Sequence, residues 1–158
     1  MIEKLTKTLA LSLLVITMAA CGGSDDDEGP DTQGPSVEIT TPNTTDTYKR
    51  SGNLPLEATF TDNRGLDNCE ITIDYVGEIP GSAELKGIGT PWTPAESNKV
   101  HTIKFNDVKT KDVNESQLFD MSIEPSCLSG VYRLTFVISD NAPEPNVTTE
   151  TIDIKIGG

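Results

Sequence analysis

Residues 129–141 read SGVYRLTFVISDN, and every second residue from Tyr132 to Ile138 is apolar. Successive side chains of a β-strand point to opposite faces, so a period of two places these apolar residues together on one face. A strand of this kind buries one side and leaves the other in water. Residues 129–141 therefore predict a half-buried strand of an antiparallel sheet.

The same alternation recurs along the rest of the chain between clusters of Gly, Pro, Asn and Asp, and no long helical periodicity appears. Seven such strands, each with one apolar face, predict an all-β sandwich of two packed sheets. The Gly- and Pro-rich stretch 76–99 holds at most one more short strand, near residues 83–86. The other six segments with period-two alternation are 36–40, 54–60, 69–75, 101–105, 119–123 and 151–156.

The run from Gly130 to Asp140 resembles the sixth strand of bacterial immunoglobulin-like and cadherin-like domains. Together with the turn sequence FTDNRGL at 60–66, it is similar to a Bacteroidota lipoprotein family, the domain-of-unknown-function family 4625. The resemblance covers residues 36–158 and implies an immunoglobulin-like β-sandwich of about seven strands in an envelope lipoprotein. That family has no established activity, so the resemblance implies fold and location rather than function.

Residues 1–20 differ in character from everything that follows. Lys4 and Lys7 precede an apolar run over 9–18 that is too short to cross a bilayer and is typical of a signal peptide. The sequence MAAC that ends at Cys21 resembles the bacterial lipobox, with Met in the position usually held by Leu. The resemblance implies cleavage before Cys21 and attachment of lipid to it, which would anchor the chain in a membrane. The alternative is an ordinary secretory signal with a chance cysteine.

Residues 21–35 are rich in Gly, Pro and acidic residues, a composition that predicts a flexible tether rather than a packed element. An acidic cluster just after a lipidated cysteine resembles the export signal of surface lipoproteins in the Bacteroidota. This implies display on the outer leaflet of the outer membrane, facing the medium. The alternative is a plain acidic spacer in a periplasmic lipoprotein.

The whole chain has 158 residues, with 12 Lys and Arg against 25 Asp and Glu, for a formal net charge of −13. Such an excess of acid argues against nucleic-acid binding and against docking on anionic lipid through basic patches. The lone histidine, His101, alternates in phase with the apolar residues of its strand, which favours a structural role. No nucleophile elbow, phosphate loop or zinc-ligand spacing is present, so we expect no enzymatic activity. A carboxylate pair for sugar hydrolysis is the remaining enzymatic alternative.

Acidic residues cluster in two loops that the topology brings together. In an immunoglobulin-like sandwich the second and sixth strands run in the same direction, so the loops after them share one end of the molecule. Asp62 and Asp67 lie in the first loop, and Asp140 and Glu144 lie in the second. Their oxygens suit Ca²⁺, and the run DNAP at 140–143 resembles the calcium-binding linker of cadherins, although the rest of that ligand set is missing. The alternative is that these residues serve only as turn formers.

The even pair Cys69 and Cys127 suggests a disulfide in an exported domain. The expected strand order opposes it, because it separates the two cysteines by ~23 Å of strand, whereas a disulfide tolerates ~7 Å between Cα atoms. Either the cysteines are unpaired and buried, or the strand order differs. Trp92 lies in a Pro-flanked loop, where it would either stack against a sugar ligand or close the end of the sandwich.

These observations favour a surface-displayed, non-catalytic binding or adhesion module with a glycan or protein ligand. The contact surface expected from the sequence is the acidic loop end, because rigid scaffolds carry function on their loops. The alternative is a structural accessory subunit of an outer-membrane or polysaccharide-uptake assembly.

Overall fold

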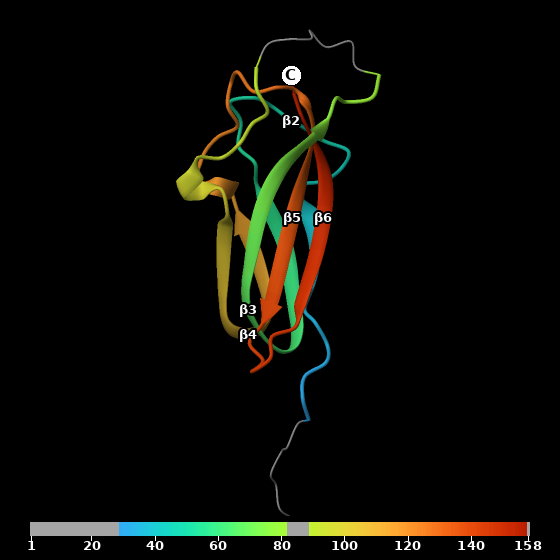
Figure 1. Ribbon diagram of the computed structural model, residues 1–158, viewed down its shortest axis with the longest axis vertical. Helices are drawn as coiled ribbons and strands as arrows, with labels where there is room; N and C mark the ends of the chain where they lie inside the picture. The colour runs from blue at the N-terminus through green and yellow to red at the C-terminus, as the bar shows by residue number, and fades with distance from the viewer. Residues whose placement is uncertain (1–28, 82–88, 158) are drawn as a thin grey trace, which may run out of the picture.

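The computed structural model describes residues 29–81 and 89–157. The signal peptide, Cys21 and the strand expected near 83–86 lie outside these ranges. Within them the fold is all-β, with two short 3₁₀ helices as the only helical segments (Figure 1). None of the described helices has the length and apolar character needed to cross a bilayer. The elements are β1 (Ser36–Thr41), β2 (Thr47–Tyr48), β3 (Leu56–Gly77), η1 (Glu96–Asn98), β4 (His101–Glu115), η2 (Leu118–Asp120), β5 (Gly130–Asp140) and β6 (Val147–Ile156).

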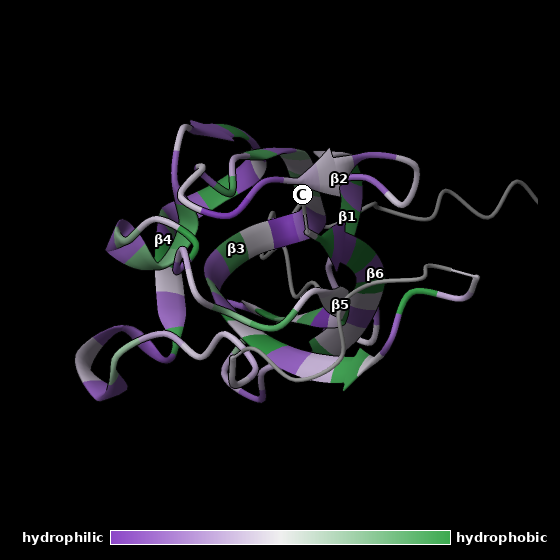
Figure 2. Ribbon diagram, turned by 90° about the horizontal axis from the view of Figure 1, so that it is seen from above, coloured by the Kyte–Doolittle hydropathy of each residue, from purple (hydrophilic) through white to green (hydrophobic). Residues whose placement is uncertain are grey.

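Strand β3 organises the sheet, because it changes partner along its length. Its first part pairs antiparallel with β1, and its second part pairs antiparallel with β5. The change falls at a register irregularity between Thr61 and Asn68, where β3 bends. Strand β4 follows β3 through both parts, β5 pairs with β6, and β2 adds the one parallel pairing, to β6. The strands therefore surround one interior, as the view along the long axis shows (Figure 2).

The interior is filled by the alternating apolar residues that the sequence pattern identifies. In β5 every second residue from Gly130 to Asp140 is buried. The inward residues of β3 and of the C-terminal part of β6 face them across the same core. Burial of a side chain such as Phe136 contributes on the order of 2 kcal/mol through the hydrophobic effect. The immunoglobulin-like, all-β fold expected from the sequence is confirmed, with six strands in the described residues.

Two strand assignments need correction. The segments 54–60 and 69–75 belong to one long bent strand, β3, rather than to two strands. Residues 119–123 alternate in polarity but are not a strand, because Phe119 adopts a positive φ of 62° inside η2. That turn buries both Leu118 and Phe119, so the apolar residues cover the end of the core instead of lining a sheet face.

Candidate metal centre

Two acidic residues occupy inward positions at one end of the sandwich. Asp140 continues the buried phase of β5 after Ile138 and is 1% exposed. Asp62 continues the buried phase of β3 after Phe60 and is 8% exposed. The period of two that builds the core therefore also turns these two carboxylates inward.

The bend of β3 is built around the carboxylate of Asp62. Its Oδ1 atom accepts hydrogen bonds from the backbone N–H groups of Arg64, at 2.8 Å, and Gly65, at 2.7 Å. An Asp side chain that binds the backbone two or three residues ahead forms a tight turn in place of a ladder. This turn coincides with the irregular register of β3 and places residues 62–65 at the end of the molecule.

Asp140 closes the loop between β5 and β6 in the same way. Its Oδ1 atom accepts from the backbone N–H groups of Ala142, at 3.1 Å, and Asn146, at 2.9 Å, and its Oδ2 atom accepts from the Asn146 side chain at 2.7 Å. The N–H group of Asn141 donates to the carbonyl of Gly65 at 2.9 Å. This last bond joins the two acidic loops, so their expected convergence at one end is confirmed.

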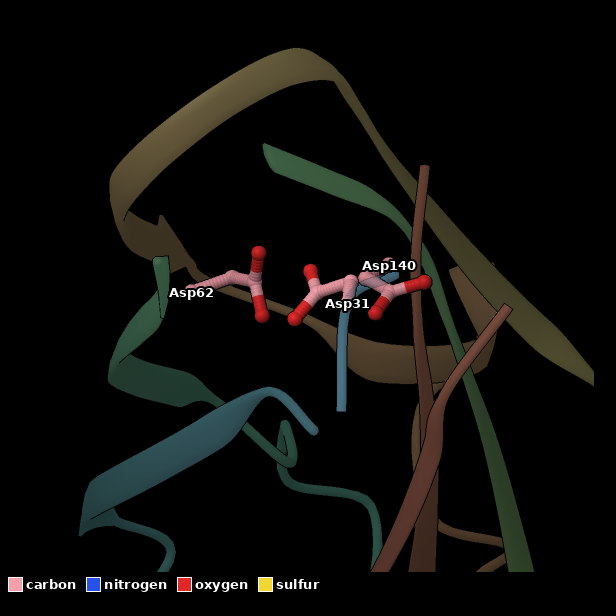
Figure 3. Close-up of side chains that lie close together, drawn as sticks. All are labelled: Asp31, Asp62 and Asp140. Carbon is pink, nitrogen blue, oxygen red and sulfur yellow. The ribbon is translucent and has the colours of Figure 1, made fainter. Parts of the chain in front are cut away.

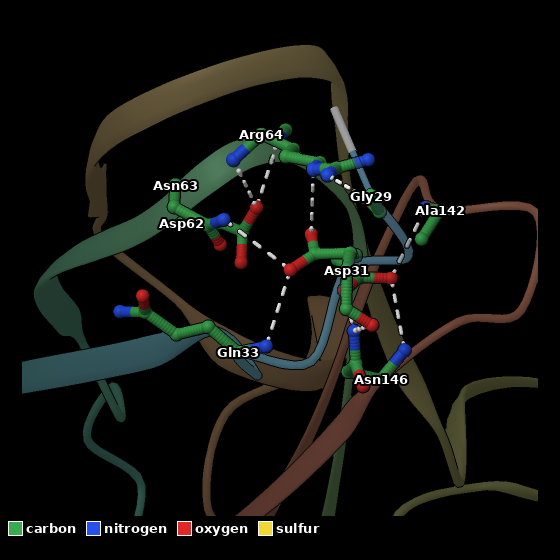
Figure 4. Close-up of polar contacts among 10 residues, drawn as sticks. Gly29, Asp31, Gln33, Asp62, Asn63, Arg64, Ala142 and Asn146 are labelled. Atoms are coloured by element: carbon green, nitrogen blue, oxygen red, sulfur yellow. Dashed lines mark hydrogen bonds and ion pairs between the residues drawn. The ribbon is translucent and has the colours of Figure 1, made fainter. Parts of the chain in front are cut away.

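A third carboxylate comes from the N-terminal segment that precedes β1. Oδ1 of Asp31 accepts hydrogen bonds from the Gln33 backbone N–H, at 3.1 Å, and the Asn63 side chain, at 3.2 Å, while Oδ2 lies 3.6 Å from Nε of Arg64 (Figure 4). The Asp31 side chain is only 2% exposed. The Gln33 N–H bond, followed by the Asn63 bond and the Arg64 charge, outweighs the effect of burial and holds the pKa of Asp31 below its usual value.

Asp31, Asp62 and Asp140 form what we call the acidic triad (Figure 3). One carboxylate oxygen of each lies within 4.8 Å of the others. Among the described residues, Oδ2 of Asp31 and Oδ2 of Asp62 are buried and have no hydrogen-bond partner. Closely spaced carboxylates repel one another strongly away from bulk water, and oxygen ligands of this kind suit hard cations. The triad could therefore hold a metal ion.

Two of the four acidic residues expected at the metal site, Asp62 and Asp140, belong to the triad, and two do not. Asp67 is exposed, and its carboxylate accepts a hydrogen bond from Asn68 at 2.6 Å. Glu144 is exposed at the rim, where it lines a hollow of about 320 Å³ beside Asp31. The bend of β3 changes the strand's phase and turns Asp67 away, which corrects the expected ligand set.

The sequence pattern did not identify Asp31. It lies in a segment of low hydrophobicity assigned to the tether, and no strand periodicity includes it. The sequence does contain a signal that Asp62 and Asp140 are buried. Extending the alternation of each core strand by one step reaches these two residues.

Of the two possibilities that the sequence left open for Cys69 and Cys127, the structure shows the unpaired one, because both are free, buried thiols. Cys69 pairs in register with Ile138 near the C-terminal end of β5, whereas Cys127 precedes Gly130 at the other end. Eight residues of strand separate those ends by about 26 Å, far beyond disulfide reach. The places of the two cysteines at opposite ends of β5 thus explain why no bridge forms.

Of the two roles that the sequence left open for Trp92, ligand contact and end plug, the burial of the side chain opposes the first. The side chain is 1% exposed, packs edge-on against Phe119 with ring centroids 6.0 Å apart, and closes the end of the core. Its backbone N–H donates to the Tyr132 hydroxyl at 3.0 Å. A buried indole cannot stack on a sugar, so the alternative of an end plug holds.

His101 has a structural environment. Its Nδ1 atom accepts the backbone N–H of Phe119 at 3.2 Å, and its Nε2 atom lies 2.7 Å from Oε2 of Glu115. Because Nδ1 accepts, Nε2 carries the proton and donates to the carboxylate. The histidine thereby joins the two ends of β4 to η2.

Comparison with known proteins agrees with the fold. Residues 35–104 match the family model described as a bacterial Ig domain. No curated protein matches the chain. This part of the chain is thus similar to a bacterial immunoglobulin-like domain, in agreement with the all-β fold. The narrower resemblance to family 4625 of Bacteroidota lipoproteins stays a prediction.

Proposed function

We propose that this chain is a non-catalytic binding or adhesion module, anchored by lipid on Cys21 and displayed on the outer face of the outer membrane. The bacterial immunoglobulin-like domain supports this class of function. The lipobox resemblance and the acidic segment that follows it support the location. The ligand is a glycan or protein outside the cell.

One structural observation supports a particular orientation of the domain relative to the membrane. The N-terminal segment meets the domain at the triad end, which we define as the end bearing Asp31, Asp62 and Asp140 (Figure 1). Asp31 follows Cys21 by ten positions, and ten extended residues span at most about 36 Å. A lipid on Cys21 would therefore hold the triad end near the membrane and direct the opposite end outward. The ligand-contact surface then shifts from the acidic loops to the far end, which bears Gly77 and Ile156.

The half of the domain toward the far end offers a contact surface with both polar and apolar residues. A hollow of about 240 Å³ opens between the second part of β3 and the start of β4. Val76 beside it is 50% exposed, and Val100 on its wall is 45% exposed. Apolar side chains left in water beside a hollow mark a surface that a ligand could cover. The hollow is lined by Thr72, Ile73, Asp74, Tyr75, Thr93, Lys99 and Val100.

Binding by the full chain tests the proposal. Chains carrying Cys21→Ser, immobilised and exposed to glycan arrays and to extracellular proteins, should retain a ligand. Val100→Asp should weaken that retention about tenfold or more, since a buried apolar contact becomes a desolvated charge. Val147→Asp is the matched control, because Val147 is 59% exposed at the start of β6, near the triad end.

Two results would contradict the binding module. Equal loss of retention with both Val variants would remove the far end as the contact surface. Crosslinking in cells to one stoichiometric membrane partner, with no soluble ligand retained, would favour the structural accessory subunit instead.

We also propose Ca²⁺ as the ion that the acidic triad takes. The three ligand groups are carboxylates, which suit a hard cation, and no described His or Cys joins the cluster. Ca²⁺ accepts six to eight oxygen ligands at flexible positions, whereas Mg²⁺ requires a nearly ideal octahedron.

A further inference from the structure

We infer that Ca²⁺ at the acidic triad is the joint that fixes the N-terminal segment to the domain. The inference rests on the Ca²⁺ part of the proposed function and does not depend on lipid attachment. The ion would bind three parts of the chain at once, because its ligands come from three segments. Asp31 lies before β1, Asp62 lies at the bend of β3, and Asp140 ends β5.

The buried Asp62 oxygen that has no partner indicates a ligand rather than a chance cluster of acids. Asp62 is 8% exposed, and its Oδ2 atom has no hydrogen-bond partner among the described residues, although its Oδ1 atom has two. Oδ2 of Asp31 is also buried without a hydrogen bond, and its ion-pair partner, Nε of Arg64, lies 3.6 Å away. A buried carboxylate oxygen without a partner is costly, and a cation between these atoms would remove that cost.

The local charge favours an ion of charge +2. Three carboxylates face one another, and the Arg64 guanidinium lies 3.6 Å from Asp31. The net charge of these four groups is about −2. Two further acids lie nearby, Glu144 on the rim and Asp107 beside Gly65, and both increase the attraction for a cation.

The N-terminal segment is the part that would respond to loss of the ion. Asp62 and Asp140 are fixed by turn hydrogen bonds inside the sheet. Asp31 lies outside the strands and is held by polar contacts that include the 3.3 Å bond from the Asn146 side chain to its carbonyl. The Arg64 guanidinium also donates to the carbonyl of Gly29 (Figure 4). Without a cation, repulsion among the three carboxylates would act mainly to displace residues 29–33.

The test combines calorimetry with hydrogen exchange on the full chain carrying Cys21→Ser. Titration with CaCl₂ should show one site with a Kd below about 1 mM. Saturating Ca²⁺ should slow amide exchange in a peptide covering residues 29–36 by about tenfold or more, because the joint limits local opening. Asp31→Asn should weaken Ca²⁺ binding by roughly tenfold, since affinity follows the charge of the ligands, and should abolish the slowing.

Two variants complete the design. Asp62→Asn keeps an oxygen for the turn bonds to Arg64 and Gly65, so the domain should stay folded while Ca²⁺ binding falls. Asp67→Asn removes an exposed acid from the same loop and should change neither affinity nor exchange.

The contradicting outcomes separate the two proposals. No binding heat up to several times the expected Kd, with no change in exchange, would overturn both the Ca²⁺ site and the joint. Equal binding by the parent chain and Asp31→Asn, with exchange in residues 29–36 unaffected by Ca²⁺, would overturn the joint and leave a site at Asp62 and Asp140.

Discussion

At the scale of single residues, Asp62 and Asp140 occupy positions that strand alternation otherwise gives to apolar side chains. Both carboxylates offset their burial by accepting backbone N–H groups of the turns that follow them. Their roles differ in the second oxygen. Oδ2 of Asp140 is bonded to the Asn146 side chain, whereas Oδ2 of Asp62 has no hydrogen-bond partner in the described chain. Both oxygens of Asp140 are therefore used to hold its loop. Asp62 uses one oxygen to hold a turn, and its other oxygen is left for the proposed cation.

The two buried cysteines should be chemically inert in the folded domain. Burial, followed by the nearby charge of Glu70, raises the pKa of Cys69 to about 12, and burial is also the main cause of the raised pKa of Cys127. The thiolate is the reactive species, so at pH 8 a thiol reagent should find almost none of it. In the full chain carrying Cys21→Ser, a chromogenic disulfide reagent should detect no thiol under native conditions and two after denaturation without reductant. Zero thiols after denaturation would restore the disulfide.

At the scale of strands, the start of β5 depends on the absence of a side chain at Gly130. A Cβ atom there would lie 2.3 Å from the Tyr75 ring and 2.5 Å from the carbonyl oxygen of Gly77. Gly130→Ala should therefore lower the free energy of unfolding by about 1–3 kcal/mol, as overpacked cores do. The matched control is Gly77→Ala on the facing strand, where a Cβ atom meets nothing within 4 Å and the change should be within about 0.5 kcal/mol. Similar urea midpoints for the two variants would show that the strands can move apart to make room for a side chain at position 130.

The pairing of β5 with β6 carries a pH-dependent contribution from Arg133 and Asp153. Two hydrogen bonds of 2.7 and 2.9 Å join them, and the Arg133 bonds hold the pKa of Asp153 below its usual value. Because the folded-state pKa is the lower one, the stabilisation is complete above the unfolded pKa, near 3.9, and is lost as pH falls through the folded pKa. Both side chains are more than 40% exposed, so Asp153→Asn should cost less than about 1 kcal/mol at pH 7. The difference in urea stability from the parent chain should shrink below pH 4; a constant difference would exclude a charge effect.

How far the sequence predicts the elements depends on how much of each element is buried on one face. β5 alternates cleanly over its whole length, so period-two analysis located it, whereas β6 alternates only in its C-terminal part and was located only there. β2 has two residues and is held by its pairing with β6, which no local pattern encodes. Residues 119–123 alternate as a strand would, but tertiary packing against Trp92 selects a turn. Asp31 joins the site through contacts made across the fold, so only the three-dimensional structure identifies it.

At the scale of the whole molecule, the triad and the direction of display are linked. The N-terminal segment and the two acidic loops meet at one end, and β6 ends at the other (Figure 1). If lipid on Cys21 holds the chain, an ion at the triad would limit the angles between domain and membrane. The same acids that argue against nucleic-acid binding would then set how rigidly the far end is presented.

The orientation can be measured on the lipidated full chain in vesicles. A donor dye attached at Asn141→Cys, in the loop beside Asp140, should transfer energy to acceptor-labelled lipid headgroups more efficiently than a dye at Glu78→Cys, just after Gly77. Strand β5 joins these two ends, and its ten steps of about 3.3 Å separate them by about 33 Å, a difference that energy transfer resolves.

Neither native cysteine of the domain should compete for label, because both are buried. Both dye positions are exposed, which keeps the labelling comparable. Equal transfer from the two positions would mean that the domain lies along the membrane or tumbles freely about the segment that joins it to Cys21. More efficient transfer from position 78 would reverse the orientation and return the acidic loops to the outward surface. If the orientation is as proposed, removing Ca²⁺ should reduce the difference in energy-transfer efficiency between the two dye positions, since release of Asp31 would free the domain to tilt.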